Sequence, residues 1–250
     1  MIQVGDEQIR QRHFPLEGSY NIRDVGGYTT SDGYTTRWRT FLRADSLHRL
    51  TPVSQQYLID YGLRTVIDLR YERELATAPD VFANSSEVNY VNISLMAEAA
   101  PNAERRYWPD LESLYKYILD ERQEVVKAVF DVMTQEAFPV LIHCTAGKDR
   151  TGIITALMLG LADVNHAIIA EDYALTAYFG GGMFDQFRAQ AAEAGRDMAI
   201  LERYLEAKPE AMLNTLAHLE ATYQNVPTYL QHIGLTTTQL NRLRQTIVAK

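Results

Sequence analysis

The chain has 250 residues, of which 46% are hydrophobic, and its 32 acidic and 24 basic side chains give a net charge of −8. This length can bury the core of a single domain, and the acidic balance argues against a general nucleic-acid binder. No run of about 18 apolar residues is present, so the sequence predicts no transmembrane helix.

Strands and helices are predicted to alternate in the first part of the chain. Residues 35–47 are partly alternating in hydrophobicity and predict a strand that runs into a turn. A Thr cap, a Pro at the first helical position and a closing Gly predict a short helix over 51–62. The β-branched runs at 63–70 and 87–95 predict two more strands, and apolar positions at helical spacing predict one or two helices over 110–135.

The second part of the chain is predicted to contain one more strand and then helices. Residues 138–144 are wholly apolar up to the final His-Cys, which is typical of a strand buried on both faces of a mixed or parallel sheet. Helical patterns follow over residues 151–162, 164–178, 184–194, 196–206, 208–224 and 236–247. The predicted fold class is α/β, with a central, mostly parallel sheet flanked by helices and a helical C-terminal region.

The segment HCTAGKDRTG, residues 143–152, contains the only cysteine, Cys144, and joins the predicted strand to the next helix. Such a loop can turn its backbone N–H groups inward as an anion nest, and the helix N-terminus adds partial positive charge. Gly147 permits the backbone angles that a nest needs. This field favours the thiolate of Cys144, and Arg150 is spaced to bind two phosphate oxygens.

The loop therefore predicts a nucleophile, Cys144, held over a phosphate site. The alternative is a buried structural thiol, but a strand-to-helix nest with a returning arginine favours the nucleophile. The Thr151 hydroxyl can hydrogen-bond the thiolate when it leaves in a second step. The residues predicted to bind phosphate are Thr145, Ala146, Gly147, Lys148 and Thr151.

His143, Cys144 and Arg150 match the HC-x5-R signature and resemble the cysteine-dependent protein tyrosine phosphatases. The fuller HCTAGKDRTG is similar to the bacterial branch related to the mycobacterial tyrosine phosphatase B. The blocks NIRDVGGY, LRADSL, VIDLR and EDYALT and the helical C-terminus resemble that branch in the same order. The resemblance implies hydrolysis of phosphotyrosine, with phosphoserine and phosphothreonine as further candidates, through a phosphocysteine intermediate and without a metal or other cofactor.

Two other functions stay open. A phosphoinositide phosphatase on the same scaffold is an alternative because Lys148 adds a second cation to the loop, although a lysine there can also be merely solvated. A phosphate-binding adaptor without turnover is less favoured, since both Cys144 and Arg150 are present. A basic rim could come from Arg23, Arg37, Arg39 and Arg43, which could instead pair structurally with Asp24, Asp45 or Asp68.

The leaving group must be protonated, and one carboxyl can serve both as this acid and later as the base. Asp149 lies inside the loop, where its alternative role is to orient Arg150. Asp110 ends the YWPD segment at 107–110, which resembles the acid motif of eukaryotic tyrosine phosphatases but also fits a helix N-cap. Asp68 ends a predicted strand and could simply pair with an arginine. We favour Asp149, then Asp110, then Asp68.

Three consecutive glycines at 180–182 predict a hinge before two helices. The resemblance implies that residues 180–206 form a helical lid over the active site, in which Met183, Phe184 and Phe187 would meet the pocket. The alternative is a static hairpin that completes the core. The polar N-terminus lacks the apolar stretch of a signal peptide, so a cytoplasmic location is predicted, with signal-less secretion as the alternative.

Overall fold

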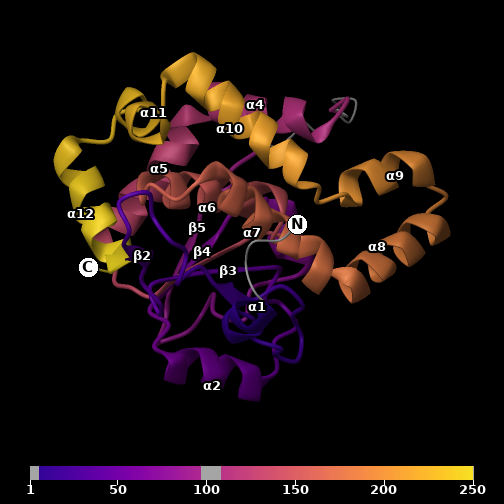
Figure 1. Cartoon of the computed structure of the whole chain (residues 1–250). Coiled ribbons are helices and arrows are strands. Elements are labelled where there is room, and N and C mark those ends of the chain that lie inside the picture. The colour runs from indigo at the N-terminus through magenta and orange to yellow at the C-terminus, as the bar shows by residue number, and fades with distance from the viewer. Residues whose placement is uncertain (1–5, 97–107, 250) are drawn as a thin grey trace.

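A five-stranded sheet forms the centre of the computed structural model, which describes residues 6–96 and 108–249 (Figure 1). The strand order is β1-β3-β6-β4-β5. β3, β6, β4 and β5 run parallel to their neighbours, and β1 pairs antiparallel with β3, which confirms the mostly parallel sheet. The strands are β1 (Arg23–Asp24), β3 (Phe41–Ala44), β4 (Thr65–Asp68), β5 (Asn89–Asn92) and β6 (Val140–His143). A separate antiparallel pair joins β2 (Thr35–Thr36) to β7 (Val248–Ala249).

Helices cover both faces of this sheet, as predicted. The first group is α1 (Asp6–Arg12), α2 (Pro52–Tyr61), α3 (Glu72–Thr77), α4 (Leu111–Glu121), α5 (Gln123–Gln135) and α6 (Asp149–Leu161). The C-terminal group is α7 (His166–Phe179), α8 (Gly181–Glu193), α9 (Met198–Leu205), α10 (Pro209–Tyr223), α11 (Val226–His232) and α12 (Thr237–Ile247). None of the helices in the described ranges is long and apolar enough to cross a membrane.

The alternation of side chains along the strands builds two cores. Leu42, Val66 and Leu141 face α2 and pack with its Leu58. Their neighbours along the strands face the opposite way, into a larger core formed with α4–α7 and α10–α12, and Figure 1 shows α2 and α6 on opposite sides of the sheet. A strand that is apolar on both faces therefore lies at the centre of the sheet, as the sequence of β6 predicts.

The structure refines several sequence expectations. The one or two helices predicted over 110–135 are two, separated at Arg122, and the short helices α1, α3 and α11 have no counterpart among the predicted elements. The glycines at 180–182 lie at the break between two helices, since α7 ends at Phe179 and α8 begins at Gly181, and their role as a hinge stays a prediction. A Cβ at Gly182 would lie 2.8 Å from the ring of Tyr20, so this glycine allows α8 to pack against the N-terminal segment.

The parallel pairing places three loops at one edge of the sheet. Asp68 of β4 and Ala44 of β3 are both in register with His143 of β6, so the chain leaves all three strands side by side. The carboxyl edge of a parallel sheet is where open α/β folds place their sites. Residues that follow β3, β4 and β6 are thereby brought together although about a hundred residues separate β3 from β6.

Candidate active site

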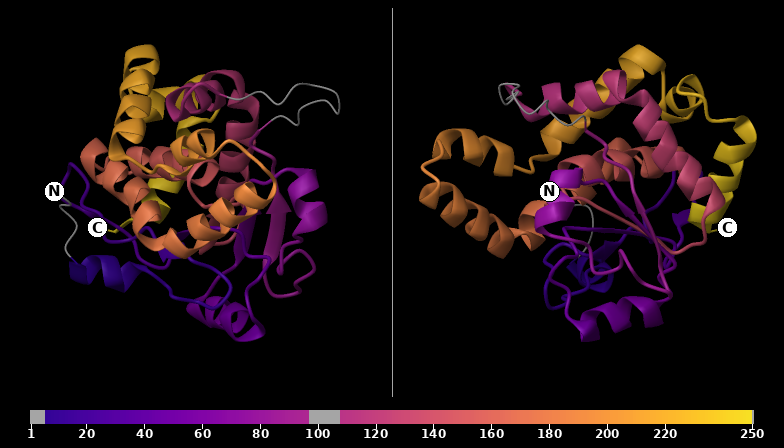
Figure 2. Two further views of the ribbon diagram at one scale, coloured as in Figure 1. Left: turned by 90° about the vertical axis from the view of Figure 1, so that its right-hand side faces the viewer. Right: turned by 180° about the vertical axis from the view of Figure 1, so that it is seen from behind.

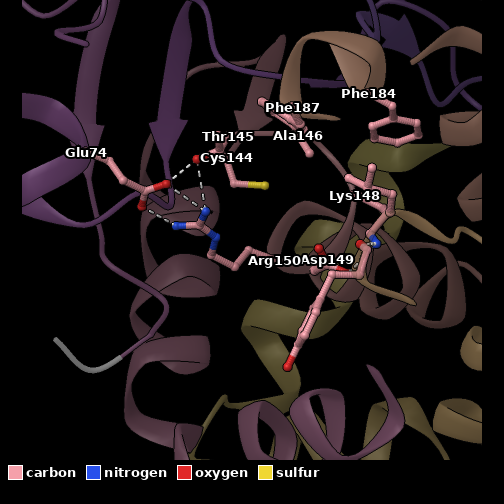
Figure 3. A pocket seen from close by; sticks show the side chains of 11 residues that line it. Glu74, Cys144, Thr145, Ala146, Lys148, Asp149, Arg150, Phe184 and Phe187 are labelled. Atoms are coloured by element: carbon pink, nitrogen blue, oxygen red, sulfur yellow. Dashed lines mark hydrogen bonds and ion pairs between the residues drawn. The ribbon is translucent and has the colours of Figure 1, made fainter. Parts of the chain in front are cut away.

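A cavity of about 260 Å³ lies at this edge, over the loop between β6 and α6 (Figure 3). Figure 3 shows the sulfur of Cys144 pointing into the space between Arg150 and Phe184. The Cys144 side chain is otherwise buried, with 2% of the residue exposed. The cavity is lined by Glu74, Cys144, Thr145, Ala146, Lys148, Asp149, Arg150, Phe184, Phe187, Tyr204 and Leu205.

The loop after Cys144 holds its carbonyl groups away from this cavity. The Thr145 carbonyl accepts from the Ser46 N–H at 3.1 Å, and the Ala146 carbonyl accepts from the Asn21 side chain at 3.2 Å. The Gly147 carbonyl accepts from Arg43 Nη2 at 2.7 Å. In a trans peptide the N–H points opposite to the carbonyl. The N–H groups of residues 146, 147 and 148 are thus directed to the other side, and none of them donates a hydrogen bond within the described part of the chain.

Gly147 is required at its position for two reasons. Its φ is +64°, in the left-handed region, and a Cβ there would lie 2.3 Å from the Ala44 carbonyl oxygen. Both restrictions come from the close approach of the loop to the end of β3. The prediction that Gly147 supplies special backbone angles is confirmed.

Arg150 is fixed by a carboxylate that the sequence analysis did not identify. Its Nη1 and Nη2 donate to the two Glu74 carboxylate oxygens at 2.7 and 3.0 Å, a bidentate pair. Thr145 Oγ1 also donates to Glu74 and accepts from Arg150 Nη2. Burial opposes the charge on Arg150, but Cys144 and Glu74 outweigh burial and raise the pKa of the guanidinium. The cation therefore stays charged and oriented beside the thiol.

Glu74 reaches this position because α3 follows β4, the neighbour of β6. It is the third residue of α3, and its carboxylate also accepts from the Tyr71 N–H, the N-cap position. Glutamate at this position is an ordinary helix-start signal. That signal could have indicated the short helix, but it contains nothing about an arginine 76 residues later.

Of the three aspartates considered as the acid, Asp149 alone lines the cavity. Asp110 caps α4, accepting from the Ser113 N–H at 2.7 Å, so its N-cap interpretation is confirmed; Tyr107 of the YWPD segment lies outside the described residues. Asp68 is buried, bonded to Arg70 and to the Tyr90 hydroxyl. Neither of them lines the cavity.

Lys148 is not a solvated cation, because its ammonium is buried and hydrogen-bonded. Its side chain is 1% exposed, and its Nζ donates to the backbone carbonyls of Tyr204 and Glu206 at the end of α9, the latter at 2.8 Å. Nζ also lies 3.4 Å from Asp149 Oδ1. The C-terminal carbonyls of a helix carry partial negative charge, which suits an ammonium. Lys148 thus joins the loop to α9.

Thr151 and the four arginines lie outside the cavity lining. Thr151 is fully buried, and its hydroxyl has no hydrogen-bond partner among the described residues, Cys144 included. The expected basic rim is wrong for this structure. Arg23 and Arg43 are buried and paired with Asp172, a partner that was not among those predicted. Arg37 and Arg39 donate to backbone carbonyls of residues 246, 248 and 61.

His143 lies in a buried ionic cluster beneath the loop. Its Nε2 is 3.2 Å from Asp80 and 3.5 Å from Asp68, and Arg70 bonds to Asp68 at 2.7 Å. Two carboxylates and a histidine could ligate a metal ion, but the guanidinium already supplies the positive charge. Burial lowers the pKa of His143, and the two carboxylates outweigh it and raise that pKa. The cluster fits an imidazolium better than a metal.

The hairpin of α8 and α9 covers one side of the cavity. Met183, Phe184 and Leu205 form a small hydrophobic cluster of their own, packed against Ala146 of the loop. Figure 2 shows the two helices standing out from the body of the protein. Phe184 and Phe187 line the cavity as expected, whereas Met183 packs in the cluster. Movement of residues 180–206 as a lid stays a prediction.

Comparison with known proteins identifies this arrangement. The family model described as the tyrosine phosphatase family matches residues 14–249. The chain belongs to the tyrosine phosphatase family. This tyrosine phosphatase is thereby an enzyme, a hydrolase of phosphoric monoesters, and the resemblance noted in its sequence motifs is confirmed at that level.

Two bacterial phosphatases are similar to this chain over most of its length, and one solved structure is similar over part of it. The chain is 34% identical over 216 residues to a tyrosine-protein phosphatase of Nostoc commune, covering 82% of this chain and 72% of that one. It is 26% identical over 279 residues to the triple specificity protein phosphatase PtpB of Mycobacterium tuberculosis, covering 92% and 96%. The solved catalytic core of Siw14 is 14% identical, covers 60% of this chain and 78% of its own, and has a TM-score of 0.34.

Proposed function

We propose that this phosphatase hydrolyses phosphotyrosine in proteins by a two-step reaction on Cys144. The observation that supports this most directly is the loop itself. The carbonyls of residues 145, 146 and 147 bond to the body of the protein, so the N–H groups of residues 146, 147 and 148 are directed to the opposite side. Ala146 and Lys148 line the cavity together with Cys144 and Arg150. Such a set of donors suits the non-bridging oxygens of a phosphoryl group.

In the first step the Cys144 thiolate attacks phosphorus, the S–P bond forms and the bond from phosphorus to the tyrosine oxygen breaks. The leaving oxygen takes a proton from the Asp149 carboxyl, which lines the same cavity. Arg150 and the loop N–H groups stabilise the charge on the transferring phosphoryl oxygens. Glu74 keeps the guanidinium plane fixed, so that little reorientation is needed during the reaction.

In the second step water attacks phosphorus and the S–P bond breaks. Asp149, now a carboxylate, accepts a proton from this water, and Cys144 leaves as the thiolate. The products are inorganic phosphate and the starting form of the enzyme. One carboxyl, that of Asp149 in the cavity lining, thus serves as acid and then as base.

The walls of the cavity favour an aromatic substrate. Phe184, Phe187 and Tyr204 line the cavity together with the catalytic loop. Lys148 argues against a phosphoinositide, because its ammonium is bonded to carbonyls at the end of α9. It would have to leave them to bind a second phosphate of the lipid headgroup. The similar protein PtpB is named a triple specificity protein phosphatase, which is a reason to compare several substrates.

We expect kcat/KM for a phosphotyrosine peptide to exceed that for the matching phosphoserine peptide by about tenfold, since an aromatic pair contributes roughly 0.5–1.5 kcal/mol beyond area burial. A soluble phosphoinositide should be slower still. Release of inorganic phosphate from the three substrates at equal concentration measures this. A phosphoinositide turned over faster than the phosphotyrosine peptide would contradict the proposal and favour the lipid phosphatase.

Asp149→Asn should lower kcat/KM about 10²-fold with phenyl phosphate, because the leaving phenolate then departs without a proton and kcat/KM does not depend on the second step. With an activated ester such as difluoromethylumbelliferyl phosphate, whose leaving group is a much weaker base, the loss should be small. Asp110→Asn is the matched control, since asparagine also caps helices well and Asp110 lies outside the cavity lining. Equal losses of Asp149→Asn on both esters would remove Asp149 as the acid.

A further inference from the structure

Two buried tyrosines form a hydrogen-bonded chain that ends on Asp149. The Tyr115 hydroxyl of α4 donates to Asp149 Oδ1 at 2.5 Å, and the hydroxyls of Tyr115 and Tyr173 are 2.7 Å apart. Tyr115 and Tyr173 are 0% and 1% exposed. Neither tyrosine lines the cavity, and the reaction described above does not use them.

The direction of this chain follows from the number of protons. A tyrosine hydroxyl has one proton to donate. Because Tyr115 gives its proton to the Asp149 carboxylate, Tyr173 must donate to the Tyr115 oxygen. Burial, with the nearby Asp149 charge, raises the pKa of Tyr115 well above its ordinary value, so the hydroxyl is a neutral donor near neutral pH.

Gly152 supplies independent support for this arrangement. It is the last residue of the HCTAGKDRTG segment, and its conformation does not itself demand glycine. A Cβ at this position would lie 3.0 Å from Cδ2 and 3.4 Å from Cε2 of the Tyr173 ring. The missing side chain therefore lets Tyr173 approach α6 closely enough to reach Tyr115. This is a role for Gly152 that the phosphate loop does not explain.

The two oxygens of Asp149 are consequently different. Oδ1 accepts from Tyr115 and lies 3.4 Å from Lys148 Nζ, whereas Oδ2 accepts no hydrogen bond from the described residues. When the carboxyl is protonated, the proton is disfavoured on Oδ1, because the Tyr115 hydroxyl and the Lys148 ammonium already point at that oxygen. The proton is therefore carried by Oδ2. We propose that Tyr115, supported by Tyr173, is a positioning residue that fixes the Asp149 carboxyl and directs its proton from Oδ2 toward the leaving group.

This inference rests on the proposed role of Asp149, and the test separates the two. Tyr115→Phe should lower kcat/KM with phenyl phosphate by about tenfold, the lower range for a hydrogen bond to a charged group, with at most about a twofold loss on difluoromethylumbelliferyl phosphate. Tyr173→Phe should show the same leaving-group dependence at smaller size. Tyr229→Phe is the matched control: it removes another buried hydroxyl, bonded to the Leu119 carbonyl, away from the cavity. It should change neither rate.

The double variant Tyr115→Phe with Asp149→Asn adds the decisive comparison. If Tyr115 acts through Asp149, the tyrosine substitution adds almost nothing once the acid is gone. If Asp149→Asn depends on the leaving group but Tyr115→Phe slows both esters equally, or neither, the inference about Tyr115 fails and the acid stands. If Asp149→Asn itself slows both esters equally, the proposed role of Asp149 as the acid is wrong, and the inference about Tyr115 is wrong with it.

Discussion

Cys144→Ser should abolish turnover of p-nitrophenyl phosphate, with a loss of roughly 10⁴-fold or more, because a neutral hydroxyl replaces the nucleophilic sulfur. Cys144 is buried, but serine has nearly the same shape, so the packing around it and the fold should persist. The decisive measurement is acid-quenched labelling with a ³²P-phosphorylated substrate. The wild-type enzyme should retain label on the cysteine, and the serine variant should retain none.

Two controls make this result specific. Thermal unfolding of the variant should match the wild type, which separates loss of the nucleophile from loss of the fold. A chelator should leave the wild-type rate unchanged, because Arg150 and the loop N–H groups supply the charge stabilisation. Substantial turnover by Cys144→Ser, or binding of phosphopeptide without turnover by the wild type, would contradict the proposed reaction and favour an adaptor.

Asp172→Asn should lower the free energy of unfolding by about 3–5 kcal/mol, the usual effect of removing one partner from a buried ionic group. The Asp172 carboxylate bonds Arg23 Nε at 3.1 Å, Arg43 Nη1 at 2.5 Å and the Tyr28 hydroxyl at 2.9 Å, all fully or nearly fully buried. The variant leaves two buried guanidiniums without a counter-charge. Urea unfolding followed by tryptophan fluorescence measures the change.

The same carboxylate predicts a direction for acid unfolding. Burial alone would raise the pKa of Asp172, but Arg23 and Arg43 outweigh it and hold that pKa below its ordinary value. A group with a depressed folded-state pKa stabilises the protein above its unfolded pKa, about 4, and this contribution is lost as the pH falls further. The wild type should therefore lose stability below pH of about 4, and the Asn variant should lose less over that interval.

The matched control is the exposed pair of Arg188 and Glu202, whose side chains are 40% and 49% exposed. Glu202→Gln removes the same kind of charge from a solvated ion pair, so the urea midpoint should hardly move. If Asp172→Asn were as mild as Glu202→Gln, the Asp172 cluster would not stabilise the fold in the way its buried contacts indicate. Arg43 also bonds the Gly147 carbonyl, so a stable but inactive Asp172 variant would show the cluster acting on the loop alone.

The sequence predicts correctly those features whose backbone conformation depends on residues a few positions away. The apolar run before Cys144, the glycine at 147 and the return of Arg150 are contained within one strand, one turn and one helix start. The α/β class follows from alternating patterns, and the Asp110 cap from a Pro-Asp pair before an apolar helix. In these cases the backbone conformation is set by residues within a few positions, so the sequence by itself determined them.

The tertiary structure decided which distant charges meet. Asp68, Asp110 and Asp149 carry the same side chain, and the sequence does not tell which of them reaches the site. The parallel pairing of β4 with β6 and the packing of α4 decide it: Asp149 lines the cavity with Cys144, Asp68 is buried, and Asp110 is exposed at a helix cap. Glu74 lies 76 residues from Arg150, and Asp172 lies 129 residues from Arg43 and 149 from Arg23. A charge pair forms wherever folding brings two groups within a few ångströms, and a single sequence carries no record of that distance.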